Sequence, residues 1–486
     1  MDRFILVKSF GDPELEAMLQ ALYSRSHKSI KEHLEELKIP LKEEVTEKHL
    51  KIKKSLATYY IGYGHASIGD CASATVFMEN VSIIAAKAIQ NTPLYNGQES
   101  STRYIDFKCK KDYLFNLIKD IVGQQSTKTF EKDLHEFLDS YYEMYEKVKK
   151  FIIDKERDSL PVFEKDNVTV QRAINVYAFD VARGFLPSGT LTQLSFHGTL
   201  RNLRSHFKTL RSHYLKEVRD IALEVLKELH EQYPSAFEKE LLTEKVKIDS
   251  KNKTYIDSNF LYPRFNHSTK TDLKIVNDYL YTVMVDYGGL GEANNQQANL
   301  VSMFNYYIPK EYIDALDYGS WRDLQRHRNG FINPVLPELD LSLLEEDKPF
   351  LVLNTWYNNI LIKNYDGFEG LQLLLDFGKL LKDFVSKYKD ILPLPYITPM
   401  GVSIDVLMSC KYTELDYILN LRLQETVHGS LVNFLLNLNS GVSSQVAYFL
   451  KYNERQYLRN KTYSVKRAKQ DIVRNNPDSE KCDVKN

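Results

Sequence analysis

The segment from residue 91 to residue 104 carries a cluster of side chains suited to binding an anion. Its second part reads Ser100-Ser101-Thr102-Arg103. A phosphate is held by hydroxyls, backbone N–H groups and a guanidinium fork that converge on one point, and these four residues offer all three. An ordinary surface connection has the same content of Ser, Thr and Asn, so both interpretations stay open on composition alone.

A second cluster of cations lies between residues 322 and 328. Arg322 and Arg326 are spaced to share one face of a helix, and His327 and Arg328 follow directly. Two cations on one face suit a pyrophosphate. A solvated charged face paired with Asp323 is the alternative interpretation.

Positive charge also gathers around residues 183 to 213, in Arg183, Arg201, Arg204, Arg211 and His213. Salt bridges to Glu217 and Asp220 would explain the same residues without a ligand. Upstream, the turn Gly62-Tyr63-Gly64-His65 places a histidine among glycines. That histidine is a ligand candidate, or it hydrogen-bonds the turn itself.

The elements that must position these residues are predicted from periodicity. From Ala72 to Glu79 apolar and polar residues alternate, which indicates a strand with one buried face. Asn80 is the expected N-cap of a short helix over residues 81–90. Pro93 then predicts a loop over residues 91–103.

Two long amphipathic helices are predicted farther along the chain. Apolar residues recur every three or four positions over 130–152, and again over 203–230, which we expect to be one helix. Between them, the Gly and Pro spacing over residues 182–190 predicts a bend rather than a regular element.

The chain divides into four parts by composition and order. Residues 1–232 form the first unit, the polar and lysine-rich residues 233–272 the linker, residues 273–450 the second unit and residues 451–486 a basic tail. The second unit again has a helix, a loop, a Pro/Gly bend at Pro399-Met400-Gly401 and a further helix. This repeated order predicts an internal duplication.

The composition excludes several classes of protein. With 43% hydrophobic residues in 486 the chain can bury a large core, and a formal net charge of -1 gives no global field for nucleic acid or an anionic membrane. We find no signal peptide or membrane span and expect a cytoplasmic protein. The four cysteines have no zinc-site spacing and no neighbourhood typical of a nucleophile, and no metal site is predicted.

At these motifs the chain resembles the flavin-dependent thymidylate synthases, the thymidylate synthase complementing protein family. Its members have a Gly-His-x-Ser/Thr segment, a strand, a helix and the signature R-H-R-x-x-S-x-N-x-x-S-x-R. Here Gly64-His65-Ala66-Ser67 matches the segment, and Ser101 and Arg103 match the end of the signature, with Glu99 at a position that is commonly acidic. The beginning of the signature is not matched, because residues 91–93, which read Asn-Thr-Pro, stand where Arg-His-Arg is expected.

The second half carries the part of the signature that the first half lacks. Arg326-His327-Arg328 is a literal match and Asn333 stands at the position of the signature Asn, whereas Phe331 and Leu336 replace its serines and the final Arg is missing. The resemblance therefore implies an α+β fold of two tandem repeats, each with a mixed sheet and long helices, the second of them degenerate. It also implies a homodimer in which two chains imitate the family's homotetramer.

By this resemblance the chain converts dUMP to dTMP, with methylenetetrahydrofolate as carbon donor, FAD as hydride carrier and NADPH as reductant. The nucleotide would be bound by Gln98, Glu99, Ser101, Arg103 and Arg183. The resemblance gives FAD to His65, Ser67, Arg201, Arg326, His327 and Arg328. Arg211 is the catalytic candidate, since it would favour an enolate-like form of the uracil.

Two alternatives stay open. The eroded signature fits a repurposed flavoprotein that modifies another uridine nucleotide. A non-catalytic nucleotide- or RNA-binding protein that uses the basic tail is the other alternative, and such a protein would be colourless and salt-sensitive in its binding.

Overall fold

A computed structural model gives the structure of the chain for residues 15, 30–36, 66–100, 111–162, 165–243, 303–308, 315–328, 331–332, 336–337, 339–345, 352–363, 367–424 and 427–437. The chain forms two compact units, each assembled from separate stretches. Unit 1 comprises Met1–Val81, Ala88–Glu99 and Gln193–Lys253. Unit 2 comprises Ser82–Lys87, Ser100–Thr192 and Thr254–Asn486.

Unit 1 is built on a two-stranded sheet of β1 (Ser73–Ser82) and β2 (Leu191–Thr199). The alternation read from the sequence is confirmed, because exposed residues of β1 alternate with more buried ones up to Met78. A 3-10 helix (Ala66–Cys71) precedes the sheet in sequence. The described helices of the unit are α2 (Ile30–Glu36), α9 (Leu200–Leu210), α10 (Lys216–Gln232) and α11 (Glu240–Thr243).

The expected helix start at Asn80 is wrong. Strand β1 continues to Ser82, and the helix, α5, spans Ile83–Ile89. Its cap is Ser82, whose Oγ accepts the N–H of Ala85 at 3.0 Å. Asn80 lies within the strand with φ 54°, a left-handed conformation that Asn tolerates better than most residues. Asn and Ser both cap helices, so the sequence alone allows a cap at either Asn80 or Ser82. Because β1 continues to Ser82, the cap is Ser82.

The single helix expected over residues 203–230 is also wrong, because the chain breaks between α9 and α10. At the break, Nδ1 of His213 accepts the N–H of Leu215 at 3.1 Å. Arg219 donates through Nη1 to the carbonyls of His213 and Tyr214, both at 2.7 Å. The apolar faces of the two helices stay in phase across the break, so periodicity alone could not reveal it.

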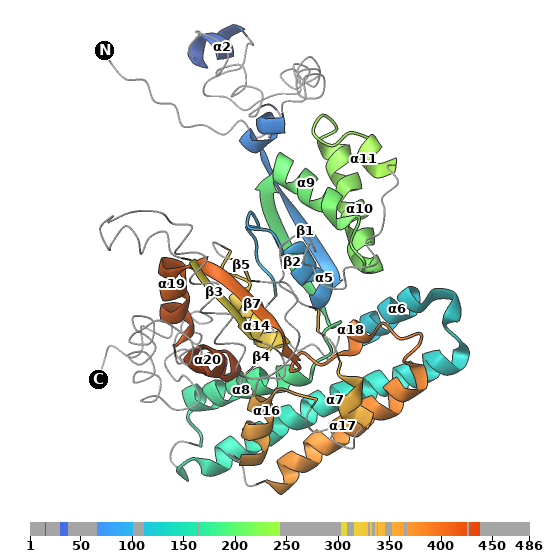
Figure 1. The fold of residues 1–486 in the computed structure, drawn as a ribbon, viewed down its shortest axis with the longest axis vertical. Helices are drawn as coiled ribbons and strands as arrows, with labels where there is room; N and C mark the ends of the chain where they lie inside the picture. The colour runs from blue at the N-terminus through green and yellow to red at the C-terminus, as the bar shows by residue number, and fades with distance from the viewer. Residues whose placement is uncertain are drawn as a thin grey trace. The chain divides into compact units, whose positions relative to one another are not determined.

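Long helices form the frame of unit 2 (Figure 1). Helix α7 (Lys128–Ser159) packs against α8 (Val168–Ala182) and against α17 (Phe368–Tyr388). Phe137 and Phe384 stack between α7 and α17 with ring centroids 4.0 Å apart. The amphipathic helix expected over residues 130–152 is confirmed and is longer at both ends. The other described α-helices that lie wholly in this unit are α6 (Lys111–Val122), α14 (Tyr318–Leu324), α15 (Leu341–Glu345), α16 (Thr355–Asn358), α18 (Leu394–Ile397), α19 (Tyr412–Arg422) and α20 (Gly429–Asn437).

Two small antiparallel sheets complete unit 2. One has the order β3 (Met303–Ile308), β7 (Val406–Lys411) and β5 (Phe331–Ile332), with Met303 opposite Lys411. The other pairs β4 (Leu316–Asp317) with β6 (Ser403–Ile404). Long helices with small sheets make the fold α+β, as expected from the sequence.

The two Pro/Gly bends of the sequence pair with each other in unit 2. Their prolines, Pro187 and Pro399, form an antiparallel bridge. The N–H of Ser188 donates to the carbonyl of Thr398, and the N–H of Met400 donates to the carbonyl of Leu186, both at 2.8 Å. A second reciprocal pair follows, from Gly189 to Tyr396 and from Gly401 to Gly184, again both at 2.8 Å. Each bend therefore gives the other the same bonds, as segments related by a two-fold axis do.

The strand-to-helix junctions that meet these bends also match. Ser82 ends β1 and caps α5, and Asp317 ends β4 and caps α14 by accepting the N–H of Ser320 at 2.9 Å. The first helical N–H groups, of Ile83 and Tyr318, donate to the carbonyls of Thr190 and Val402, both at 3.0 Å. The two halves of the chain thus build the same junction with the same bonds.

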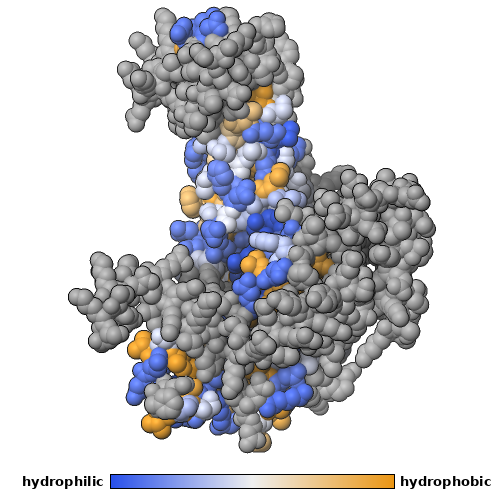
Figure 2. All heavy atoms as spheres, turned by 90° about the vertical axis from the view of Figure 1, so that its left-hand side faces the viewer, coloured by the Kyte–Doolittle hydropathy of each residue, from blue (hydrophilic) through white to orange (hydrophobic). Residues whose placement is uncertain are grey.

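On the face shown in Figure 2, hydrophilic and hydrophobic residues lie next to one another over the described surface. Within the described part of the chain, none of the helices has the length and apolar content needed to cross a membrane.

We predict that Gly189→Ala destabilises the protein through the paired bends. A Cβ at this position would lie 2.6 Å from the carbonyl oxygen of Tyr396, which is backbone and cannot rotate away. The expected loss in free energy of unfolding is about 1–3 kcal/mol, measured by urea titration. Gly198→Ala is the control, because its Cβ would approach only side chains, at 3.2 Å or more. Equal losses in both variants would contradict this account of the bends.

Candidate functional site

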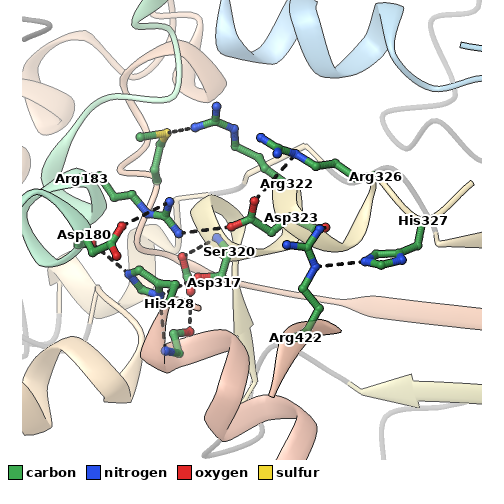
Figure 3. Close-up of polar contacts among 12 residues, drawn as sticks. Asp180, Arg183, Asp317, Ser320, Arg322, Asp323, Arg326, His327, Arg422 and His428 are labelled. Atoms are coloured by element: carbon green, nitrogen blue, oxygen red, sulfur yellow. Dashed lines mark hydrogen bonds and ion pairs between the residues drawn. The ribbon is translucent and has the colours of Figure 1, made fainter. Parts of the chain in front are cut away.

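A buried cluster of charged side chains lies in unit 2, where the end of α8 meets α14 (Figure 3). It contains Asp180 and Arg183 from the first half of the chain. The second half supplies Asp317, Ser320, Arg322, Asp323, Arg326, His327, Arg422 and His428. The paired bends bring these distant segments together, since Arg183 follows α8 directly and stands at the start of the first bend.

Arg183 is the centre of the cluster and is only 4% exposed. Its guanidinium lies 3.8 Å from the carboxylate of Asp180 and 3.8 Å from that of Asp323. Both distances are too long for a hydrogen bond, and Nε and Nη2 find no hydrogen-bond acceptor within the described residues. Burial opposes the charge, but Asp180 and Asp323 outweigh it and raise the pKa of Arg183. A buried cation with open donors is suited to accept an oxyanion.

Two more arginines of the α14 segment lie beside Asp323. Arg326 is about half exposed and its Nε lies 3.8 Å from Oδ1 of Asp323, while Arg183 faces Oδ2. Arg322 is 5% exposed, and its Nη1 lies 3.6 Å from the sulfur of Met400 in the second bend. Arg183 and Arg326 thus share the carboxylate of Asp323, one at each oxygen.

His327 is held by internal contacts. Its Nε2 accepts the Nε–H of Arg422 at 3.0 Å, and Arg422 also donates to the carbonyl of Asp323 at 2.8 Å. Burial, followed by the neighbouring arginines, lowers the pKa of His327 to about 4. The imidazole is therefore neutral at pH 7, with its proton on Nδ1, which lies 3.8 Å from Oε1 of Glu414. In this arrangement His327 orients Arg422 rather than adding charge.

A second layer of buried polar groups fixes α14. The carboxylate of Asp317 caps the helix and also accepts from the hydroxyl of Tyr357 at 3.2 Å and from that of Ser430. Burial raises the pKa of Asp317. Ser320 contacts Nδ1 of His428 at 2.8 Å, and Nε2 of His428 reaches the carbonyl of Asp180 at 2.9 Å. This network connects the arginines of α14 to the segment that carries Arg183.

The structure brings some of the predicted site residues together. Arg183, Arg326 and His327 lie in the cluster, and Arg328 follows them in a turn. Three predicted residues, His65, Ser101 and Arg103, lie outside the described residues.

The remaining predicted residues lie in unit 1. Arg201 forms an ion pair with Asp70 at 2.6 Å, and Glu99 accepts from Gln90 at 3.0 Å. The backbone N–H of Gln98 donates to Ser195 at 3.2 Å, and Arg211 donates to the carbonyl of Leu241. The last of the set, Ser67, is exposed in the 3-10 helix.

Several residues of the cluster were not singled out from the sequence as site residues. They are Asp180, Asp317, Ser320, Arg422 and His428, together with Asp323, which entered only as an ion-pair partner. Two positional signals were available. Arg422 ends a helix on a Leu-Arg pair, as Arg211 follows Leu210, and Asp317 stands at a helix start. His428 and Asp180 carry no such signal, because their role depends on contacts between distant segments.

The described cysteines are unsuited to nucleophilic catalysis. Cys71 and Cys410 are free thiols. Burial raises the pKa of Cys410 to about 12, and burial also raises that of Cys71. Neither is a thiolate at pH 7. Among the residues that the structure describes, no group of three His, Cys, Asp or Glu side chains is placed to hold a metal ion.

Comparison with known families tests the resemblance that was seen in the sequence. Residues 6–235 match the family of the thymidylate synthase complementing protein. The match contains Arg183 and the bend that follows it, and it ends before the second half of the chain begins. The resemblance seen in the sequence is therefore confirmed at the level of this family for residues 6–235.

Two relatives from the genus Chlamydia match parts of the chain. The UPF0159 protein of Chlamydia pneumoniae is 30% identical over 180 residues, which are 36% of this chain and 33% of that protein. The UPF0159 protein of Chlamydia muridarum (strain MoPn / Nigg) is 28% identical over 201 residues, 40% of this chain and 37% of that protein. The chain thus matches about a third of the length of these relatives.

A crystal structure of thymidylate synthase X from Helicobacter pylori with FAD and dUMP was also found. It is 15% identical, and the alignment covers 47% of this chain and 95% of that one. The TM-score is 0.26, too low for an argument about the fold of this chain.

We predict that His327 makes stability depend on pH in the acid range. Its folded pKa of about 4 lies below the ordinary value of about 6.5, so its contribution is present above pH 6.5 and is lost as the pH falls toward 4. In His327→Asn the loss of unfolding free energy between pH 7 and pH 4.5 should be smaller than in the natural chain, by on the order of 2 kcal/mol. Urea unfolding between pH 7 and pH 4.5 measures this loss in both proteins. The difference between their free energies of unfolding at pH 8 serves as the reference. Parallel pH curves would contradict the prediction.

Proposed function

We propose that the chain is a flavin-dependent thymidylate synthase, which methylates dUMP reductively to dTMP. Methylenetetrahydrofolate would give the carbon, NADPH the reducing equivalents, and FAD would carry the hydride. The observation that carries this proposal is the match of residues 6–235 to the thymidylate synthase complementing protein family. The buried guanidinium of Arg183, which lies inside that match and has open donors, supports a phosphate ligand.

The residues of unit 2 fit the phosphate groups of such ligands. Arg183 offers two donor atoms without an acceptor among the described residues. Arg326 is about half exposed and lies beside the carboxylate of Asp323. We assign the nucleotide phosphate to Arg183 with Ser101 and Arg103, and the FAD pyrophosphate to the segment Arg326 to Arg328. When bound, FAD supplies the hydride chemistry, and the protein binds and orients the reactants.

Roles for the other residues follow the family resemblance. Gln98 and Glu99 would orient the nucleotide, and His65, Ser67 and Arg201 would contact FAD. Arg211 remains our candidate for polarising the uracil. Its contact with the carbonyl of Leu241 supports a guanidinium held in a fixed position.

We further propose that the chain is a tandem duplication and that two chains assemble into a pseudo-tetramer. The reciprocal bonds between the bends at Pro187 and Pro399 support the duplication, as do the equivalent caps Ser82 and Asp317. In this proposal residues 1–232 and 273–450 are the two repeats, joined by residues 233–272, and residues 451–486 are a tail. The cell compartment that we expect for this enzyme is the cytoplasm.

One observation favours a second candidate function. The position of Arg-His-Arg in the first half is occupied by Asn91, Thr92 and Pro93, so a cofactor or substrate contact of that half is altered. A flavoprotein that modifies another uridine nucleotide would tolerate this change. Product analysis by mass spectrometry after incubation with dUMP or UMP distinguishes this alternative from the synthase.

We predict that expression of the chain lets a thymidine-requiring bacterial strain grow without thymidine. Arg103→Ala should abolish growth and nucleotide binding while FAD stays bound, because the change removes the guanidinium fork assigned to the nucleotide phosphate. Lys147→Ala is the matched control, since this exposed lysine pairs with Glu143 of its own helix, α7. Growth is scored on selective medium and flavin content by absorbance. Full growth of the Arg103→Ala strain would remove the assignment, and a colourless natural chain would remove the proposed function.

A further inference from the structure

We propose that Arg219 is a positioning residue of the proposed enzyme, because it holds the joint between α9 and α10 closed and thereby fixes Arg211. Arg211 is the C-cap of α9, and the joint that follows it consists of residues 212–215. Arg219 lies in the first turn of α10, within the same unit of the chain. The proposal rests on the proposed function only for the chemistry of Arg211, and the closed joint is testable without it.

The joint ends one helix and begins the next within four residues. The N–H of Arg211 still bonds to the carbonyl of Phe207 at 3.2 Å. The N–H groups of Ser212 and His213 bond to carbonyls only three residues earlier, both at 3.0 Å, so the helix tightens and ends there. Helix α10 begins directly after Leu215, whose side chain has no oxygen with which to cap a helix. The joint therefore depends on other groups to bond its backbone.

His213 and Arg219 supply these bonds. Nδ1 of His213 accepts the N–H of Leu215 at 3.1 Å. Nη1 of Arg219 donates to the carbonyls of His213 and Tyr214, both at 2.7 Å. Burial, followed by Arg219, lowers the pKa of His213 to about 4, so the imidazole is neutral at pH 7 and Nδ1 can accept. Since a charged donor makes a hydrogen bond roughly twice as strong as a neutral one, Arg219 is the main link of the joint.

Arg211 is held at its guanidinium as well as at its backbone. The guanidinium donates to the carbonyl of Leu241 in α11, a residue that is 2% exposed. Helix α10 packs against both α9 and α11 (Figure 1). The segment before α11 is also bound to α9, because Nε of Arg204 donates to Glu238 at 3.2 Å. All of these bonds form at the same time only while the joint keeps α9 and α10 at their present angle.

A shift of Arg211 matters because its proposed task is to polarise the uracil. A group with such a task has to be placed to within about 0.5 Å, and a displacement of about 1 Å costs on the order of a hundredfold in rate. Loss of the bonds from Arg219 should therefore lower kcat. It should leave KM for the nucleotide nearly unchanged, because the residues assigned to the nucleotide phosphate, Ser101, Arg103 and Arg183, are not part of the joint.

The first test is steady-state kinetics of dTMP formation by the full chain. In Arg219→Gln, kcat should fall about tenfold or more, while KM for dUMP should change by less than about twofold. Because a single nitrogen of Arg219 makes both bonds, the ammonium of Arg219→Lys can replace it and should restore most of the rate. Lys227→Gln is the matched control, since it removes an exposed cation from the same helix.

The second test does not depend on activity. Trypsin cleaves after arginine and lysine, so cleavage between Arg211 and Ser212, mapped by mass spectrometry, reports how often the joint opens in the folded protein. Cleavage after Lys208, inside α9, is the reference for unfolding of the helix. In Arg219→Gln the ratio of cleavage after Arg211 to cleavage after Lys208 should rise about tenfold. Arg219→Lys and Lys227→Gln should leave this ratio unchanged.

The outcomes separate this inference from the proposed function. It would be overturned by an unchanged cleavage ratio in Arg219→Gln, by a rise in KM at constant kcat, or by a rate that Arg219→Lys does not restore. Loss of the folded state of Arg219→Gln in a thermal melt would also overturn it, because Arg219 would then be needed for folding as a whole. A raised cleavage ratio, in a protein whose natural chain makes no dTMP, would refute the proposed function and still show that Arg219 holds the joint beside Arg211.

Discussion

The described architecture of unit 2 depends on backbone hydrogen bonds between two Pro/Gly bends. Ser188 and Met400 donate to the carbonyls of Thr398 and Leu186, and Gly189 and Gly401 add a matching pair. These donors and acceptors are buried, where an unpaired backbone group costs about as much as a lost hydrogen bond. The pairing therefore sets the position of everything attached to the bends. That includes Arg183 at the end of α8, and α14, whose first N–H groups bond to the second bend.

A buried arginine has to be stabilised by charge. Arg183 is enclosed with Asp180 and Asp323, and a polar network around Asp317 and His428 holds these residues in place. Removing one member of such a group leaves another charge buried without its counter-ion, which costs several kcal/mol, roughly 3–5. Each buried charge of the cluster therefore depends on the others.

Sequence reasoning predicted the long helix α7, the strand β1 and the bends, because each depends on local periodicity or on a short motif. It also named Arg183 and Arg326 as site residues, and their roles stay a prediction. It failed at Asn80 and at the break between α9 and α10. In both places a local pattern fits two conformations, and a tertiary contact selects one of them. The sequence also could not predict that Arg183 and Arg326 both lie next to Asp323. Nothing in the order of residues shows that the two bends pair. Ser101 and Arg103 lie outside the described residues, so their assignment rests on the resemblance alone.

Two consecutive tyrosines of α7 connect this helix to both bends. The hydroxyl of Tyr142 contacts Thr190 Oγ1 at 3.0 Å, and that of Tyr141 donates to the carbonyl of Ile397 at 2.9 Å. During synthesis the ribosome makes Tyr141 long before Ile397, and a buried hydroxyl without its acceptor costs about 1–3 kcal/mol. An amino-terminal part without the later bend therefore lacks the acceptor for one of its buried hydroxyls. The helical frame thus has all of its hydrogen bonds to the bends only once residues from both halves of the chain are present.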